Sequence, residues 1–132
     1  MKEGLDGVVL SNHGGRYVDC APAPLQVLPE VRAAVGDRFP VIIDSGARRG
    51  SDLVKAIALG ADMVMSGRPT LWGAAAAGEA GAFRALEIFR EEMDRVMAQL
   101  GLNSIAEIGP QIFWNPPDWV PSPGDPMRAA AE

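Results

Sequence analysis

The chain has 132 residues, 48% hydrophobic and 22% charged, which suits one ordinary globular domain rather than a largely disordered chain. Its net charge of −5 argues against a nucleic-acid-binding protein, because such proteins usually carry a basic surface. Cys20 is the only cysteine, so no internal disulfide can form, which fits a reducing compartment such as the cytoplasm. No apolar run approaches the roughly 20 residues that a membrane-spanning helix needs, and no metal site is predicted.

Three short apolar runs predict three buried strands, at residues 7–10, 41–43 and 63–65. The second run, Val41-Ile42-Ile43, is rich in β-branched residues, as a buried parallel strand should be. Helical patterns fill both connections between the runs. Helical crossovers make consecutive strands parallel neighbours, so the sequence predicts an α/β fold.

The first helix is predicted from residue 25 to residue 35, where apolar residues recur at helical spacing, and Gly36 ends it. Ser51 is predicted to cap the second helix, which has Asp52 in its first turn and ends at Gly60. Pro69 suits the first turn of a third helix.

A long amphipathic helix is predicted from residue 78 to residue 100, followed by a short helix near residue 103 or 104. The predicted apolar face of the long helix comprises Phe83, Leu86, Phe89, Met93, Val96, Met97 and Leu100. Beyond residue 110 the chain is rich in proline, glycine and aspartate. This composition predicts a main unit over residues 1–110 and an extended or disordered tail over residues 111–132.

The loop after the first strand, Ser11-Asn12-His13-Gly14-Gly15-Arg16, holds the only histidine in the sequence. Histidine titrates near neutral pH and arginine binds carboxylates or phosphates in a planar fork, so His13 and Arg16 are candidates for proton transfer and carboxylate binding. The alternative reading is a structural histidine that caps the loop, beside an arginine in a surface ion pair.

The loops after the second and third strands predict a phosphate-binding site. Arg48 and Arg68 supply charge, and the glycines at 46 and 67 let the main chain approach a ligand before a helix begins. Gly67-Arg68-Pro69 also matches the phosphate-binding loops late in a TIM barrel. The alternative is surface pairing of these arginines with Asp44, Asp52 or Glu79.

All three loops follow the carboxyl ends of parallel strands, where α/β proteins bind their ligands, so the sequence predicts that they form one site. The competing reading is that each loop simply needs glycine and polar residues to turn. That reading explains one such loop well and three poorly.

Three motifs in this order and spacing resemble the FMN-dependent α-hydroxy-acid dehydrogenase/oxidase family, over roughly residues 4–110. They are Ser11-Asn12-His13-Gly14-Gly15-Arg16 with Asp19, the run from Asp44 to Asp52, and Gly67-Arg68-Pro69 after Ala58-Leu59-Gly60-Ala61. Within the family, the wording of the first two motifs is most similar to the mandelate dehydrogenase branch.

The resemblance implies the C-terminal part, about strands six to eight, of a (β/α)8 TIM barrel with FMN as cofactor. It implies that an L-2-hydroxy acid of the lactate, glycolate or mandelate class is oxidised to the 2-oxo acid. His13 would be the base at the substrate α-carbon and Arg16 would bind the substrate carboxylate. The residues implied in FMN binding are Ser11, Asp44, Ser45, Gly46, Ala47, Arg48, Gly67 and Arg68.

A closed barrel of this type needs about 250 residues, so the chain is expected to hold only its last three strands. The family's remaining site residues would lie upstream of residue 1. The alternative to an active oxidoreductase is therefore an inactive fragment or complementation half that pairs with the missing N-terminal part. A phosphate-binding barrel enzyme without flavin is a third reading, but it would not need His13 and Arg16. A full-length homo-oligomer is expected, in the cytoplasm or at the periphery of the inner membrane.

Overall fold

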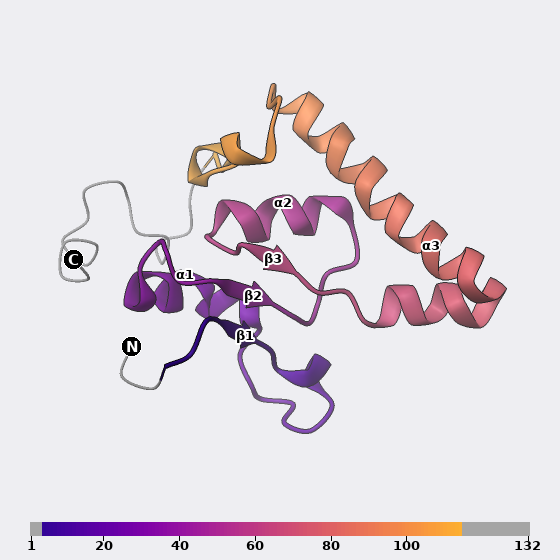
Figure 1. The fold of residues 1–132 in the computed structure, drawn as a ribbon, viewed down its shortest axis with the longest axis horizontal. Helices are drawn as coiled ribbons and strands as arrows, with labels where there is room; N and C mark the ends of the chain where they lie inside the picture. The colour runs from indigo at the N-terminus through magenta and orange to yellow at the C-terminus, as the bar shows by residue number, and fades with distance from the viewer. Residues whose placement is uncertain (1–3, 115–132) are drawn as a thin grey trace.

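The computed structural model describes residues 4–114, which form a three-stranded parallel sheet with helices after each strand (Figure 1). The strands are β1 (Val8–Leu10), β2 (Val41–Ile43) and β3 (Met63–Val64). The helices are α1 (Pro24–Val35), α2 (Gly50–Ala58) and α3 (Arg68–Gln99), with 3-10 turns η1 (His13–Gly15), η2 (Ile105–Glu107) and η3 (Pro110–Ile112). None of the helices in this part of the chain is long and apolar enough to cross a membrane.

The strand order β1-β2-β3 is the order in the sequence, and both pairs are parallel, as the helical connections predict. In register, Val9 lies opposite Ile42, and Ile42 lies opposite Met63. All three strands therefore end at the same edge of the sheet. The loops that follow them start side by side.

One face of the sheet is covered by α1 and α2. Leu28 of α1 and Val41 of β2 are fully buried, and they pack in one cluster with Ile43, Ala56 and Leu59. Alternate residues of a strand point to opposite faces, so Val9 and Met63 lie on the other face, where they are 49% and 59% exposed. The sheet is thus packed on one side only in this part of the chain.

A second cluster joins α2 to α3 and to the segment after α3. It contains Val54 and Ala58 from α2, Met93 and Met97 from α3, and Ile108. Phe113, just after η3, packs against both clusters. The tail predicted from residue 111 thus begins with packed residues, and the rest of it, residues 115–132, lies outside the described residues.

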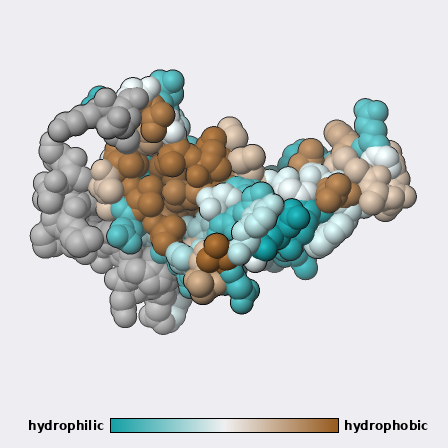
Figure 2. Space-filling model, turned by 90° about the horizontal axis from the view of Figure 1, so that it is seen from below, coloured by the Kyte–Doolittle hydropathy of each residue, from teal (hydrophilic) through white to brown (hydrophobic). Residues whose placement is uncertain are grey.

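Helix α3 is two helical segments joined by a break at Ala77 and Gly78, where φ is −151° and +59°. The break agrees with the prediction of one helix near Pro69 and a second from residue 78. The break brings Gly73 and Gly81 so close together that a Cβ on Gly81 would collide with the Gly73 carbonyl oxygen. The part of α3 around this break forms the arm that reaches to the right in Figures 1 and 2.

The predicted apolar face of α3 is only partly buried. Phe89, Met93 and Met97 are buried, whereas Phe83 and Leu86 are 63% and 52% exposed. The reason is length: α2 has only nine residues, so it covers about 13 Å of the much longer α3. The amphipathic pattern is correct, but no described element covers its N-terminal part.

The start of α2 also differs from the prediction. The helix begins at Gly50, so Ser51 lies inside it and is not its cap. The Asp52 carboxylate takes that role, because its Oδ2 accepts hydrogen bonds from the main-chain N–H groups of Arg48 (2.9 Å) and Arg49 (3.0 Å). A carboxylate at the third helical position can reach back over the free N–H groups and also favours the positive end of the helix dipole.

Candidate active site

The loops after β1 and β2 are joined by a hydrogen-bond network around the Asp44 carboxylate. Ser11 Oγ donates to Asp44 Oδ2 at 2.6 Å, and Ser45 Oγ donates to the same oxygen at 3.0 Å. The two serines in turn accept from the first loop: His13 N–H donates to Ser11 Oγ and Gly14 N–H donates to Ser45 Oγ, both at 3.0 Å. Side chains at two strand ends thus fix the main chain beside His13.

The loop after β3 joins the same network through Arg68. Its Nη2 donates to the Gly14 carbonyl oxygen at 3.1 Å. Glycine favours this approach, because Gly14 has a φ of +69° and a Cβ there would push the Arg68 guanidinium away. The structure therefore brings all three predicted loops together at one end of the sheet.

Two residues of this network have strained main-chain conformations. His13 and Ser45, at φ of +57° and +77°, are the only residues other than glycine with positive φ among residues 4–114. Such conformations are uncommon outside glycine and gather at functional sites, where the surroundings hold them in place. Here the hydrogen bonds to Ser11 and Gly14 hold them.

The Asp44 carboxyl is held in its ionised form. The hydrogen bond from Ser11 lowers its pKa most and that from Ser45 adds to this effect, which together outweigh the opposing effect of burial. The positive charge of a protonated His13 would lower the pKa of Asp44 further. Asp44 therefore carries a negative charge at the end of β2 at neutral pH.

His13 and Arg16 are exposed, and both lie near the Tyr17 ring. The His13 and Tyr17 rings are 4.8 Å apart between centroids, and Arg16 Cζ lies 6.0 Å from the Tyr17 centroid. Within the described part of the chain, the His13 ring makes no hydrogen bond. The prediction did not single out Tyr17, although its position next to Arg16 in sequence was a usable signal.

The residues of the predicted phosphate site lie in the loop after β2 and at the N-terminus of α3. Arg48 Cζ lies 5.3 Å from the Trp72 ring centroid, so Trp72 of α3 holds the guanidinium across the gap between the two loops. No described residue accepts a hydrogen bond from the main-chain N–H groups of Gly46, Ala47 or Gly67. These groups, with Arg48 and Arg68, form a donor set that suits a phosphate dianion.

Three N–H groups at the start of α2, those of Arg48, Arg49 and Gly50, already have carboxylate acceptors and are not free donors. Asp52 accepts from the N–H groups of Arg48 and Arg49, and Glu92 of α3 accepts from that of Gly50 at 2.8 Å. The free donors at the predicted phosphate site therefore lie mainly in the preceding loop and at the N-terminus of α3.

The alternative of surface pairing is not seen for the two predicted arginines. In residues 4–114, neither Arg48 nor Arg68 forms a salt bridge with any carboxylate. Arg49 is the paired arginine of this region, with Glu92. Ser66 is a further residue that the prediction passed over; its buried Oγ has no hydrogen-bond partner among the described residues, beside the Gly67 N–H.

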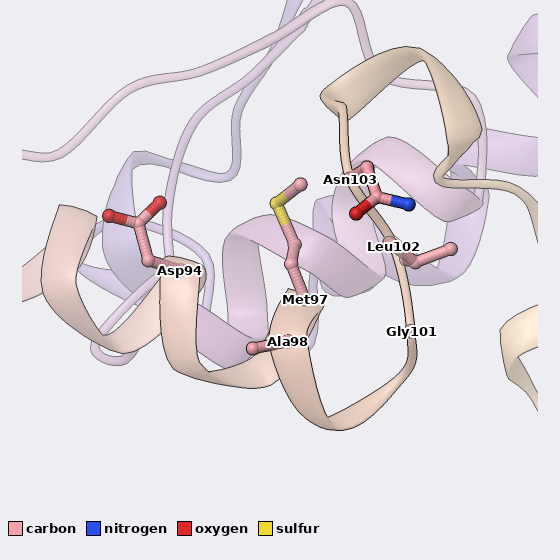
Figure 3. A pocket seen from close by; sticks show the side chains of 6 residues that line it. All are labelled: Asp94, Met97, Ala98, Gly101, Leu102 and Asn103. Atoms are coloured by element: carbon pink, nitrogen blue, oxygen red, sulfur yellow. The ribbon is translucent and has the colours of Figure 1, made fainter.

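A hollow of about 380 Å³ lies elsewhere, at the C-terminal end of α3 (Figure 3). It is lined by Asp94, Met97, Ala98, Gly101, Leu102 and Asn103. None of these residues belongs to the strand-end loops. The hollow is therefore separate from the candidate active site.

Comparison with known proteins identifies the fold and the family. Residues 1–115 match the family model described as FMN-dependent dehydrogenase. The chain is 51% identical to (S)-mandelate dehydrogenase of Pseudomonas putida over 115 residues, which cover 87% of this chain and 29% of that protein. It is 40% identical to 2-hydroxyacid oxidase of Dictyostelium discoideum, over 87% of this chain and 30% of that protein.

Solved structures agree with the sequence matches. A mutant of an active chimera of (S)-mandelate dehydrogenase superimposes with a TM-score of 0.80 at 51% identity, covering 84% of this chain and 31% of that one. The flavin-binding domain of baker's yeast flavocytochrome b2 gives 0.80 at 43% identity, over 84% and 30% of the two chains. The chain thus spans about 30% of the length of its relatives.

The three βα units are the C-terminal part, about strands six to eight, of a (β/α)8 TIM barrel. The uncovered sheet face, with Val9 and Met63, corresponds to the interior of such a barrel. The family resemblance predicted from the three motifs is confirmed, and FMN is the cofactor of this family. The chain belongs to the family of FMN-dependent dehydrogenases.

Proposed function

We propose that this chain supplies the base, the carboxylate-binding arginine and the phosphate-binding residues of an FMN-dependent enzyme that oxidises an L-2-hydroxy acid to the 2-oxo acid. The observation that carries the proposal is the network through Asp44, Ser45 and Gly14, which joins loops from three different strands. This network holds the main chain around His13 and the Arg68 guanidinium at fixed positions.

In this proposal His13 accepts the proton at the substrate α-carbon, and Arg16 binds the substrate carboxylate through its planar fork. FMN, when bound, accepts the two electrons that the hydroxy acid loses as it becomes the oxo acid. The Ser11 hydrogen bond to the His13 N–H holds the base at its place on the loop. Arg16 is exposed and so can receive an anionic substrate from solvent.

The phosphate of FMN would be bound by Arg48, Arg68 and the main-chain N–H groups of Gly46, Ala47 and Gly67. Ser11, Asp44 and Ser45 would contact the cofactor from the strand ends. The support for this assignment is that both arginines are free of carboxylate partners within residues 4–114 and that those N–H groups lack acceptors there.

The first test is an absorption spectrum of the purified chain after incubation with FMN and desalting. A retained flavin band is expected. Replacing both arginines (Arg48→Gln with Arg68→Gln) should weaken FMN binding by about 10²- to 10⁴-fold, because each charged phosphate contact is worth about 1.5–3 kcal/mol. Arg84→Gln is the matched control, since Arg84 pairs only with carboxylates of its own helix. A wild-type chain that stays colourless would contradict independent FMN binding.

A second candidate function is a complementation half that acts only with the remaining barrel strands. Two observations favour it: the chain spans about 30% of its relatives, and Val9 and Met63 are exposed on the sheet face that such strands would enclose. Co-expression with the preceding strands of the Pseudomonas putida relative should then restore flavin binding that the chain alone lacks. A homo-oligomer is the assembly we propose for the completed barrel.

We propose that the enzyme containing this chain lies either in the cytoplasm or at the surface of the inner membrane. The second is supported by a relative at 50% identity that is described as a monotopic membrane protein. Partition of the expressed protein between membrane and soluble fractions distinguishes them.

A further inference from the structure

Glu92 of α3 makes three contacts with the start of α2, although 43 residues separate it from Arg49. Its Oε2 accepts from the Gly50 N–H at 2.8 Å and from Arg49 Nε at 3.0 Å, and its Oε1 pairs with Arg49 Nη2 at 2.9 Å. The Glu92 side chain is only 17% exposed. The Arg49 guanidinium, and then the Gly50 N–H, hold the pKa of Glu92 below its ordinary value, so the carboxylate is ionised.

The packing around Gly50 keeps Glu92 in this position. A Cβ on Gly50 would collide with the main-chain nitrogen of Met93 and lie too close to the Cβ of Glu92. Those atoms belong to the main chain and the base of a side chain, so they cannot move aside cheaply. The first residue of α2 therefore lies directly against the backbone of α3.

This contact determines which donors remain for an anion. Asp52 accepts from the N–H groups of Arg48 and Arg49, so with Glu92 every N–H from residue 48 to residue 50 is taken by a carboxylate. A phosphate would be repelled from this end of α2. It is left with the preceding loop and the N-terminus of α3.

The same contact separates the roles of two adjacent arginines. The Arg49 side chain is turned toward α3, where Glu92 binds both its Nε and its Nη2. Arg48 makes no salt bridge within the described residues and lies over Trp72 beside the phosphate site. Without Glu92, Arg49 would be free to turn and the start of α2 would lose an anchor.

We infer that Glu92 is a positioning residue for the phosphate-binding loop: it anchors the start of α2 and holds Arg49 away, so that Arg48 alone of the pair binds the phosphate. This inference rests on the proposed function, since the phosphate is taken to be that of FMN. Glu92 itself does not contact the phosphate and acts only through Arg49 and Gly50.

The test compares the affinities of the chain for FMN and for riboflavin, which lacks the phosphate. Glu92→Ala should weaken FMN binding by about tenfold, the loss expected when one charged hydrogen bond to the phosphate is misplaced. Riboflavin affinity should change by less than about twofold. Glu92→Gln, which can still accept from the Gly50 N–H, should give an intermediate loss.

Glu91→Gln is the matched control, because Glu91 is the neighbouring carboxylate but pairs, among residues 4–114, only with Arg84 and Arg95 of α3. It should leave the ratio of FMN to riboflavin affinity unchanged. An equal loss of both affinities in Glu92→Ala, or no loss of either, overturns the inference.

Hydrogen exchange of the chain without flavin gives an independent readout. In Glu92→Ala, main-chain amides of residues 44–50 should exchange faster while those of α1 keep the wild-type rate. Unchanged exchange at residues 44–50, or equal acceleration throughout, overturns the positioning role. If the wild type does not prefer FMN to riboflavin, the proposed phosphate site fails, and the exchange result alone then decides the role of Glu92.

Discussion

His13 combines three properties at a single residue: it is the only histidine, it has a positive φ of +57°, and its N–H is bound by Ser11. A strained residue persists where its surroundings hold it. The strain therefore supports a role for the exact position of this side chain.

The role of His13 as a base gives the first prediction. In an active enzyme that contains this chain, His13→Gln should lower the rate of flavin reduction by the hydroxy acid by about 10²- to 10⁴-fold. FMN should remain bound, because the phosphate-binding residues are unchanged. Anaerobic stopped-flow absorbance measures the rate, and the flavin spectrum of the purified variant provides the control. Fast reduction in the variant would exclude His13 as the base.

Asp44 gives a prediction about pH. The hydrogen bond from Ser11, followed by that from Ser45, keeps the pKa of folded Asp44 below the ordinary 3.8. A carboxyl with a lowered folded pKa stabilises the fold above its unfolded pKa, and that stabilisation is lost as pH falls through the folded pKa. Removing the Ser11 hydroxyl should therefore cost more at neutral pH than in acid, where the lost hydrogen bond from the His13 N–H remains the main effect.

Ser11→Ala should lower the free energy of unfolding by about 1 kcal/mol at neutral pH. The difference from wild type should shrink as pH falls from 3.8 through the lower pKa of folded Asp44, because the carboxyl becomes protonated over this range. Urea unfolding across this range measures it. Ser51→Ala is the control: the described hydrogen bonds do not include its hydroxyl, so its effect should not vary with pH. A pH-independent effect of Ser11→Ala would contradict the prediction.

At the scale of elements, Arg32 ties α1 to the segments that lead into β2 and into β3. Its guanidinium donates to the carbonyl oxygens of Gly36 (2.9 Å), Phe39 (2.8 Å) and Gly60 (2.8 Å) and pairs with Asp62. Burial raises the pKa of Asp62, but the Val41 N–H and then Arg32 lower it further, so the net pKa is lowered. One side chain thus fixes the ends of two helices.

Arg32→Met should lower the free energy of unfolding by about 2–3 kcal/mol, because three carbonyl oxygens lose a charged donor in a site where Arg32 is only 13% exposed. Urea denaturation measures the change. Arg90→Met is the control, since Arg90 is exposed on α3 and should change stability by less than about 0.5 kcal/mol. Equal effects of the two substitutions would contradict the anchoring role of Arg32.

At the scale of the whole molecule, the uncovered face of the sheet is the feature that should govern association of the chain. Val9, Ile42 and Met63 lie opposite one another across the three strands, and the first and last of them are about half exposed. β1 and β3 also present unpaired strand edges within the described residues. Open strand edges and exposed apolar faces favour association.

The chain alone should therefore self-associate at micromolar concentration, and Val9→Lys together with Met63→Lys should reduce this association. Size-exclusion chromatography with light scattering measures the mass of each. Lys55→Glu is a charge-changing control on the exposed side of α2 and should leave association unchanged. A monomeric wild-type chain would contradict the prediction that this exposed apolar face drives self-association.

Local sequence was sufficient for most of the fold and for the members of the candidate site. The strand at 41–43 and the end of α1 at Gly36 agree with the prediction because an apolar run and a glycine act on their immediate neighbours. The convergence of three loops was also predictable, because parallel strands end at one edge of a sheet. Family motifs supplied the expected roles of His13 and Arg16.

Contacts between distant segments were not predictable. Asp52 caps α2 through a local contact, although the sequence also offered Ser51 as the cap. The hydrogen bond from the Gly50 N–H to Glu92 instead joins residues 42 apart, and no local pattern marks it. The exposure of Phe83 likewise depends on the length of α2, not on the sequence around Phe83.

The sequence by itself determined the βα order, the strand-end loops and the family, because hydrophobic periodicity, glycine positions and short motifs are properties of neighbouring residues. Only the tertiary structure decided that Arg49 is bound by Glu92 while Arg48 stays available, and that one face of the sheet is left open. Those outcomes depend on which helices meet, and the free energy of such contacts comes from residues far apart in the chain.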